Sequence, residues 1–267
     1  MTRKTNSTAL YTQLISWEPL QVAESQGFAW IKTLAKDEAT GARTALIRYE
    51  AGFRARPAVS TWPADIYTLD GDMSAGDRRY EKDTYHYRPA GTAIGAISSP
   101  RGVTRLIFTA DTPDPGKSSA EEIFIQNVIT DVAPDPGEDP RQTLRWRKTL
   151  RRDAVAGYSL RAQRSARAGV QDHPGSLHIH PWTEEAFMVS GLNQDYSSDI
   201  DGHIQWIAGL YVCRPPNGNP HGDSLKLDDD YYMIVRSGWS DDPATNAEWK
   251  KLRQSSITPL LPVAFAE

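Results

Sequence analysis

Apolar and polar residues alternate along several short segments of this chain, and Gly or Pro turns separate these segments. Residues 44–50 (TALIRYE) and 64–71 (ADIYTLDG) show the alternation clearly, and an apolar strand from Ala186 to Val189 ends near Gly191. Because successive side chains on a strand point to opposite faces, such segments suit half-buried sheets. Many short strands between turn residues predict an all-β sandwich or barrel.

One helix is expected near the C-terminus. Asp242 followed by Pro243 offers an N-cap with Pro at the first helical position, and Trp249 and Leu252 would share an apolar face.

The chain contains an internal repeat. Six residues recur at an offset of 146 minus 30, or 116: Trp30, Lys32, Thr33, Leu34, Asp37 and Gly41 return as Trp146, Lys148, Thr149, Leu150, Asp153 and Gly157. Further matches at offsets of 120 and 127 pair Trp62 with Trp182, Gly71 with Gly191, Gly91 with Gly218 and Gly95 with Gly222. Such self-similarity predicts two related units. The Pro-, Gly- and Asp-rich residues 133–140 suit a linker, so we expect domains at 1–132 and 141–267.

Length and composition agree with this division. A chain of 267 residues is long enough for one or two domains with substantial cores. The single Cys213 excludes an intramolecular disulfide and fits a reducing compartment. The N-terminus lacks the apolar segment of a signal peptide, and no stretch approaches the roughly 18 apolar residues of a membrane span. We expect a soluble cytoplasmic protein without a membrane partner.

The net charge of −4, with both signs interspersed, argues against nucleic acid as a partner. The basic run from Arg141 to Arg152 is interpreted as a solvated strand or loop face.

The strongest chemical signal is a set of three imidazoles and one carboxylate: His178, His180, Glu184 and His221. His178 and His180 stand two apart, so on a strand they face the same way. Glu184 follows a short turn, and His221 lies just beyond a second turn at residues 216–218 (PNG). This set predicts a metal site.

The ordered pattern His-x-His, three residues, Glu, six residues, Gly, and later Pro-x-Gly-x-x-His resembles the two sequence motifs of the cupin superfamily. The resemblance implies two fused cupin (jelly-roll) β-barrels and one divalent metal ion held by these four side chains. It departs from the second motif at Leu225, where many cupins have Asn.

The repeat provides an internal control. Subtracting 120, or 127 for the last ligand, places Ala58, Ser60, Ala64 and Ile94 at the four ligand positions. Ala and Ile cannot bind a metal ion, and Ser is a poor ligand for metals that imidazole suits. The first barrel is therefore structural, or it binds something other than metal.

Two insertions surround the predicted site. The second half gains three residues within the loop 170–176, which carries His173, because the offset rises from 117 to 120. It gains seven more between Gly191 and Gly218, because the offset rises from 120 to 127. This lengthened hairpin contains Tyr196, Asp199, Asp201 and His203 and is either a substrate mouth or an ordinary exposed loop.

The sequence also suggests roles for residues outside the predicted ligand set. His173 is a candidate acid or base beside the metal, with an ordinary loop role as the alternative, and His86 is interpreted as structural or exposed. Ala186 and Met188 should face inward with Glu184, whereas Glu185 should face outward. Trp182 is attributed to packing, and candidate cavity residues are Tyr211, Cys213, Gln163 and Arg161.

Three histidines and a carboxylate would leave an octahedral ion two open positions, which is typical of catalytic rather than structural sites. Iron(II) is the expected metal, with Zn, Ni, Mn and Cu as alternatives. The leading hypothesis is a mononuclear non-haem dioxygenase that cleaves a carbon–carbon bond in an enolisable ketone, diketone or aromatic compound. It comes from a similarity of the half-barrel repeat and the WxKTL opening to acetylacetone- and dihydroxyacetophenone-cleaving cupins.

Two other classes stay open. One is a redox-neutral isomerase, lyase or cyclase, and the other is a metal-dependent small-molecule sensor like the regulatory cupin domains of anti-sigma factors. The expected partners are a small-molecule substrate and dioxygen, and a homodimer is compatible with this hypothesis.

Overall fold

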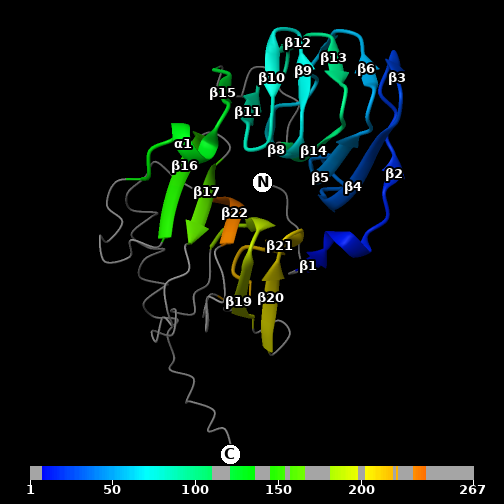
Figure 1. Ribbon diagram of the computed structural model, residues 1–267. Coiled ribbons are helices and arrows are strands. Elements are labelled where there is room, and N and C mark those ends of the chain that lie inside the picture. Colours follow the sequence, from blue (N-terminus) through cyan, green and yellow to red (C-terminus); the bar gives the residue numbers. More distant parts are fainter. Residues whose placement is uncertain are drawn as a thin grey trace, which may run out of the picture.

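We describe the protein from a computed structural model, whose described residues are 8–109, 121–135, 145–153, 157–165, 181–197, 202–218, 221 and 231–238 (Figure 1). Within these ranges the elements are strands, one 3-10 helix η1 (Thr12–Leu14) and one short helix α1 (Val128–Asp131). The all-β prediction is therefore confirmed for this part of the chain. The helix expected near Asp242 lies outside the described residues. None of the described helices has the length and apolar character needed to cross a membrane.

The first barrel consists of a seven-stranded sheet, a five-stranded sheet and a two-stranded ribbon. The large sheet has the order β15-β11-β8-β14-β5-β4-β2, the smaller one β10-β9-β13-β6-β3, and the ribbon β12-β7. The large sheet contains β2 (Glu18–Pro19), β4 (Ala29–Lys36), β5 (Arg43–Tyr49), β8 (Ala64–Gly71), β11 (Tyr85–Arg88), β14 (Val103–Thr109) and β15 (Ile123–Ile125). The other strands are β3 (Ser25–Gln26), β6 (Phe53–Ala55), β7 (Ala58–Val59), β9 (Met73–Ala75), β10 (Arg78–Tyr80), β12 (Ala93–Ile94) and β13 (Ile97–Ser99).

The second barrel is described through a six-stranded sheet and a hairpin. The sheet has the order β1-β21-β18-β22-β17-β16, and the hairpin is β19-β20. The sheet strands are β1 (Thr8–Tyr11), β16 (Arg145–Asp153), β17 (Tyr158–Ser165), β18 (Glu184–Ser190), β21 (Leu210–Arg214) and β22 (Tyr231–Gly238). The hairpin strands are β19 (Leu192–Ser197) and β20 (Gly202–Ile207).

Strand alternation sends neighbouring residues into different cores. On β18, Ala186 and Met188 belong to the core inside the second barrel, whereas Phe187 lies in a core between the two large sheets. On β5, Ile47 packs against the core of the first barrel and Leu46 against the core between the sheets. The large sheets therefore pack back to back, and the inward phase predicted for Ala186 and Met188 is confirmed.

The two halves exchange their first strands. β1, at the start of the chain, pairs with β21 of the second barrel, whereas β15, which precedes the second repeat, pairs with β11 of the first barrel. Figure 1 shows β1 beside β21 and β15 at the far edge near β11. The exchange means that the described β1 lies with residues of the proposed 141–267 unit, so those limits stay a proposal.

A buried lysine follows each exchanged strand. Lys32 donates to the carbonyl of Thr12 in η1 at 2.6 Å, and Lys148 donates to the carbonyl of Val128 in α1 at 3.2 Å. Both pairs have the same offset, since 148 minus 32 and 128 minus 12 equal 116. The repeated WxKTL segment thus anchors the short helix next to each swapped strand.

Hairpin length separates the two barrels. Gly71 and Gly191 both have positive φ, +75° and +88°, and a Cβ on Gly71 would lie 2.1 Å from the carbonyl oxygen of Gly102. The strands after Gly71 have three residues each, whereas β19 and β20 have six each. The lengthened hairpin predicted for the second half is confirmed.

Charged side chains are buried between the large sheets and are paired there. Asp65 accepts hydrogen bonds from Tyr85 at 2.6 Å, from Tyr158 at 2.9 Å and from Arg151 Nε at 3.0 Å. Arg151 also donates to Asp153 at 2.7 Å. Burial alone lowers the pKa of Arg151, but the negative charge of Asp65 and the bond to Asp153 raise it above its usual value.

The interpretation of residues 141–152 as a solvated face is wrong for Arg151. A β-bulge between Thr149 and Arg151 turns this side chain into the space between the sheets, and an equivalent bulge lies between Thr33 and Ala35. Glu185 is the matching carboxylate of the second barrel, because 185 minus 65 equals 120. It accepts hydrogen bonds from Thr44 at 2.6 Å and from Tyr211. Glu185 thus points out of its barrel, as expected, but into the interface.

We expect Asp65→Asn to lower the free energy of unfolding by about 3 kcal/mol, because it leaves Arg151 buried with one carboxylate partner fewer. Urea denaturation would measure the change. Glu24→Gln breaks the exposed pair with Arg56 and serves as the control, with no resolvable effect. A stability of Asp65→Asn within about 1 kcal/mol of the wild type would contradict this account of the interface.

Candidate metal centre

Glu184 and His221 come together at one end of the second barrel. Glu184 opens β18 and is in register with Arg214 on β21 and Ser237 on β22. Its Oε1 lies 3.6 Å from Nε2 of His221, and both side chains are buried. The predicted turn before His221 is present, since the N–H of Gly218 donates to the carbonyl of Pro215 at 3.1 Å.

The other residues predicted for the site, His173, His178 and His180, lie outside the described residues. Within the described ranges, no group of three or more His, Cys, Asp or Glu side chains is arranged to hold a metal ion. The four-ligand set therefore stays a prediction, of which the structure describes the pair Glu184 and His221.

Two arginines surround the Glu184 carboxylate. Arg214 Nη1 donates to Oε1 at 3.1 Å, and Arg161 Nη2 lies 3.6 Å from Oε2. Arg161 also donates to Ser237 Oγ at 3.0 Å. The expectation that Arg161 faces the cavity side agrees with these contacts. Arg214 was not predicted from the sequence. It stands two residues after Val212 and four after Leu210, which face inward, so strand alternation could have indicated that Arg214 faces inward as well.

Two of the candidate cavity residues lie on the other face. Tyr211 and Cys213 belong to the core between the large sheets, and the hydroxyl of Tyr211 donates to Glu185. Their assignment to the cavity is wrong, because strand alternation gives the interior to Leu210, Val212 and Arg214. Gln163 donates to the hydroxyl of Tyr231 at 3.1 Å.

The described pair is chemically suited to a divalent ion. A neutral imidazole nitrogen and a carboxylate oxygen are preferred donors for first-row transition metals. Glu184 Oε1 and His221 Nε2 lie close together. The adjacent apolar residues inside the barrel are Ala186, Met188 and Val212. Glu184, rather than Glu185, is the carboxylate that shares a barrel interior with a histidine.

The equivalent region of the first barrel has the same backbone but different chemistry. Ala58 and Ile94, at two of the ligand-equivalent positions, are paired across the ribbon β7-β12. Ala64 opens β8 and is in register with Arg88 on β11, as Glu184 is with Arg214. Strand register thus agrees with the repeat alignment at Ala64 and Glu184, whereas the counterparts of Ala58 and Ser60 lie outside the described residues.

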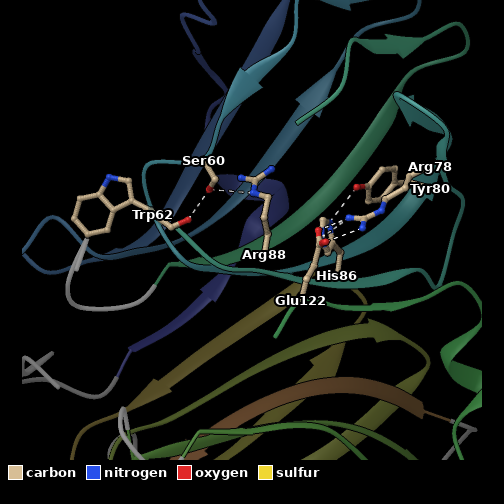
Figure 2. A network of polar contacts seen from close by, with 7 residues as sticks. All are labelled: Ser60, Trp62, Arg78, Tyr80, His86, Arg88 and Glu122. Atoms are coloured by element: carbon tan, nitrogen blue, oxygen red, sulfur yellow. Dashed lines mark hydrogen bonds and ion pairs between the residues drawn. The ribbon is translucent and has the colours of Figure 1, made fainter. Parts of the chain in front are cut away.

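A separate polar cluster explains His86 (Figure 2). The ring accepts at Nδ1 from the hydroxyl of Tyr80, at 3.0 Å, and donates from Nε2 to Glu122, at 2.7 Å. Arg78 holds the same carboxylate with both terminal nitrogens. Because Glu122 immediately precedes β15, this cluster fixes the exchanged strand to β10 and β11. The structural role proposed for His86 is confirmed.

Comparison with known proteins supports the cupin superfamily. Residues 5–113, which are 109 of the 267 residues, match the family of ChrR cupin-like domains. Curated protein sequences include none that matches this chain. The match lies over the half that lacks the predicted metal ligands.

Solved structures share the fold over most of the chain. A provisionally assigned dioxygenase from Nostoc punctiforme has a TM-score of 0.67 at 15% identity, covering 89% of this chain and 84% of that one. The 7S globulin of Momordica charantia has a TM-score of 0.54 at 9% identity, covering 86% and 83%. An oxalate decarboxylase has a TM-score of 0.51 at 14% identity, covering 88% and 78%. These similarities confirm the two-barrel cupin fold, which enzymes and globulins share.

We expect the full-length protein to bind one divalent ion per chain, and His221→Ala and Glu184→Gln each to reduce the bound ion by at least about tenfold. Elemental analysis after gel filtration measures the content, and circular dichroism should show a folded chain, because the core does not depend on the ion. Glu185→Gln and Ser60→Ala are the controls and should retain it. Two tightly bound ions per chain would contradict the assignment to one barrel.

His86 should make stability depend on pH. Burial lowers the pKa of His86 to about 4, and the bonds from Arg78 and His86 lower the pKa of Glu122 to about 2. The unfolded chain therefore binds more protons than the native chain below pH ~6.5, so stability should fall as the pH drops from about 6.5 to 4. The Glu122 contribution is present above about pH 4.5 and is lost as the pH falls toward 2.

The test is urea denaturation at a series of pH values with His86→Gln. This variant should flatten the dependence between about pH 4 and 6.5, because Gln has no charge to gain. An unchanged pH profile would show that the groups responsible lie elsewhere.

Proposed function

We propose that the protein is a mononuclear metal-dependent enzyme whose active site is the second barrel, and that its reaction is oxidative cleavage of a small enolisable substrate. The main observation behind this proposal is that Glu184 Oε1 and His221 Nε2 lie 3.6 Å apart at one end of the second barrel. The first barrel has Ala64 and Ile94 at the equivalent positions. His178 and His180 complete the proposed ligand set.

The charges around the site favour an anionic substrate form. Among the described residues, Arg161 and Arg214 place two guanidinium groups beside the carboxylate of Glu184, so the sum of these three charges is positive. A substrate that loses a proton to become an enolate would be stabilised there. Enolised diketones and catechol-like compounds have this property.

The chain's own residues would bind and orient the substrate. Arg161, held by Ser237, can donate to a substrate oxygen, and the bond between Gln163 and Tyr231 places a further polar group on the same strand pair. The apolar side chains of Ala186, Met188 and Val212 would exclude water. An iron(II) ion, when bound, would supply Lewis acidity and redox chemistry toward dioxygen. The proposed partners are accordingly a small molecule and dioxygen.

A small-molecule sensor is the second candidate. It is favoured by the family match, which covers residues 5–113 and not the half with the predicted ligands. In a sensor the first barrel would do the recognising, and no turnover of the bound compound would be observed.

Dependence on dioxygen and on the metal separates these possibilities. With iron-loaded protein and a panel of 1,3-diketones, we expect oxygen uptake with matching product formation, no turnover without oxygen, and retained substrate binding by calorimetry. Zinc-loaded protein should bind the same compounds without turning them over, since zinc has no redox chemistry.

The controls use metal content as an independent readout. Arg161→Met should raise KM while the bound ion is retained, because we assign this residue to substrate contact rather than to metal binding. Undiminished turnover by the zinc-loaded protein without oxygen would replace the oxygenase with an isomerase or lyase. Binding without turnover under every condition would favour the sensor.

A further inference from the structure

The first barrel contains a cavity of about 430 Å³ at the position where the second barrel has its predicted metal site. Three of the four ligand-equivalent residues, Ser60, Ala64 and Ile94, line it. Its size is in the range of pockets that hold small organic molecules. The loss of metal ligands has therefore left an open space rather than a filled core.

Arg88 is one of the residues that line this cavity, and Figure 2 shows its contact with Ser60. Its Nε donates to Ser60 Oγ at 3.1 Å, and Ser60 in turn donates to the carbonyl of Trp62 at 2.7 Å. Within the described part of the chain this is the single hydrogen bond of the Arg88 side chain, and no described carboxylate forms an ion pair with it. The two terminal nitrogens are thus available to a ligand.

The second barrel shows what Arg88 lacks. Arg88 and Arg214 are equivalent, because 214 minus 88 is 126 and each is in register with the first residue of the corresponding strand. In the second barrel that residue is Glu184, which accepts a hydrogen bond from Arg214. In the first barrel it is Ala64. The cavity therefore keeps the arginine and has lost its carboxylate.

The charges around the cavity are positive. Its lining includes Arg43, which is exposed, and contains no Asp or Glu among the described residues. Burial and the neighbouring Arg105 lower the pKa of Arg88 to about 10, which still leaves it charged at neutral pH. Arg105 is itself buried, with contacts to the sulfur of Met73 and the ring of Tyr80. Arg88 is half-buried and forms no ion pair with a described carboxylate, so an anion that reaches its guanidinium would be stabilised by a charge-assisted hydrogen bond.

We propose that the first barrel binds a small carboxylate with an apolar body, whose carboxylate pairs with Arg88 in the place that Glu184 occupies beside Arg214. The lining is mixed, and its apolar part includes Ile31, Ile47 and Ile107. One guanidinium beside apolar side chains matches one charge on an apolar body, whereas phosphate, with its higher charge and additional oxygens, calls for more donors. This inference does not depend on the chemistry of the second barrel.

Isothermal titration calorimetry of the full-length protein with benzoate and hexanoate tests the proposal. The neutral benzamide and hexanamide are the matched controls for shape. We expect both carboxylates to bind, and both amides to bind at least about tenfold more weakly, because an amide oxygen accepts from the guanidinium without the negative charge of a carboxylate.

Two substitutions locate the site. Arg88→Met should weaken carboxylate binding at least about tenfold, whereas Arg54→Met, at an exposed position on β6, should leave it unchanged. Ala64→Glu restores the internal partner found in the second barrel and should abolish binding. Ala64→Gln introduces a side chain of the same size as Glu but without the charge, and this variant should bind the carboxylates better than Ala64→Glu does. Thermal unfolding of each variant confirms that the chain is folded.

Repeating the titration with His221→Ala separates this site from the proposed active site, since carboxylate binding should persist when the second barrel has lost its ion. Equal affinity for acids and amides, or undiminished binding by both Arg88→Met and Ala64→Glu, would overturn the proposal. So would the absence of binding by either acid up to about 10 mM, because the expected charge-assisted contact would then contribute nothing measurable.

Discussion

Both faces of the central strands β8, β18 and β22 are buried along most of their length, and this constraint governs the rest of the molecule. One face of each large sheet lines its own barrel, and the other packs against the sheet of the opposite barrel. Where both faces are buried, a strand has no solvated side on which to place charge. A charged side chain buried there must therefore have a partner or belong to a site. Asp65, Arg151 and Glu185 satisfy the first condition in the interface, and Glu184 satisfies the second at the barrel mouth.

The sequence allowed the barrels and the phase of β18 to be predicted, since the repeat and the ligand spacing depend on local periodicity. The orientation of β21, where Tyr211 and Cys213 face the interface, could not be predicted from the sequence. Both faces of this strand are buried and largely apolar, so no polar side indicates which residues point into the barrel. The burial of Arg151 was also hidden. A run of basic residues is typical of a solvated face, and the bulge that redirects this side chain depends on backbone geometry.

The two barrels show how one backbone supports two kinds of recognition. The register between Ala64 and Arg88 is the same as that between Glu184 and Arg214, so a single change at the first residue of the strand alters what the arginine meets. In one barrel the cation is satisfied within the protein, and the carboxylate also lies beside a histidine. In the other, the cation faces a cavity. Site chemistry has diverged while the strand pairing that supports it has been retained.

The exchange of β1 and β15 has a consequence for the origin of this architecture. In a single repeat separated from the chain, the first strand would have no sheet to pair with. The edge of β11 or β21 would also be unpaired. Two such copies would fill each other's edges through a twofold axis, as an arm-exchanged dimer does. Gene duplication followed by fusion between β14 and β15 would convert that dimer into the present chain with no change in strand pairing. In a dimer of identical chains, every substitution appears in both copies. After the copies were joined in one chain, each pocket could change independently of the other.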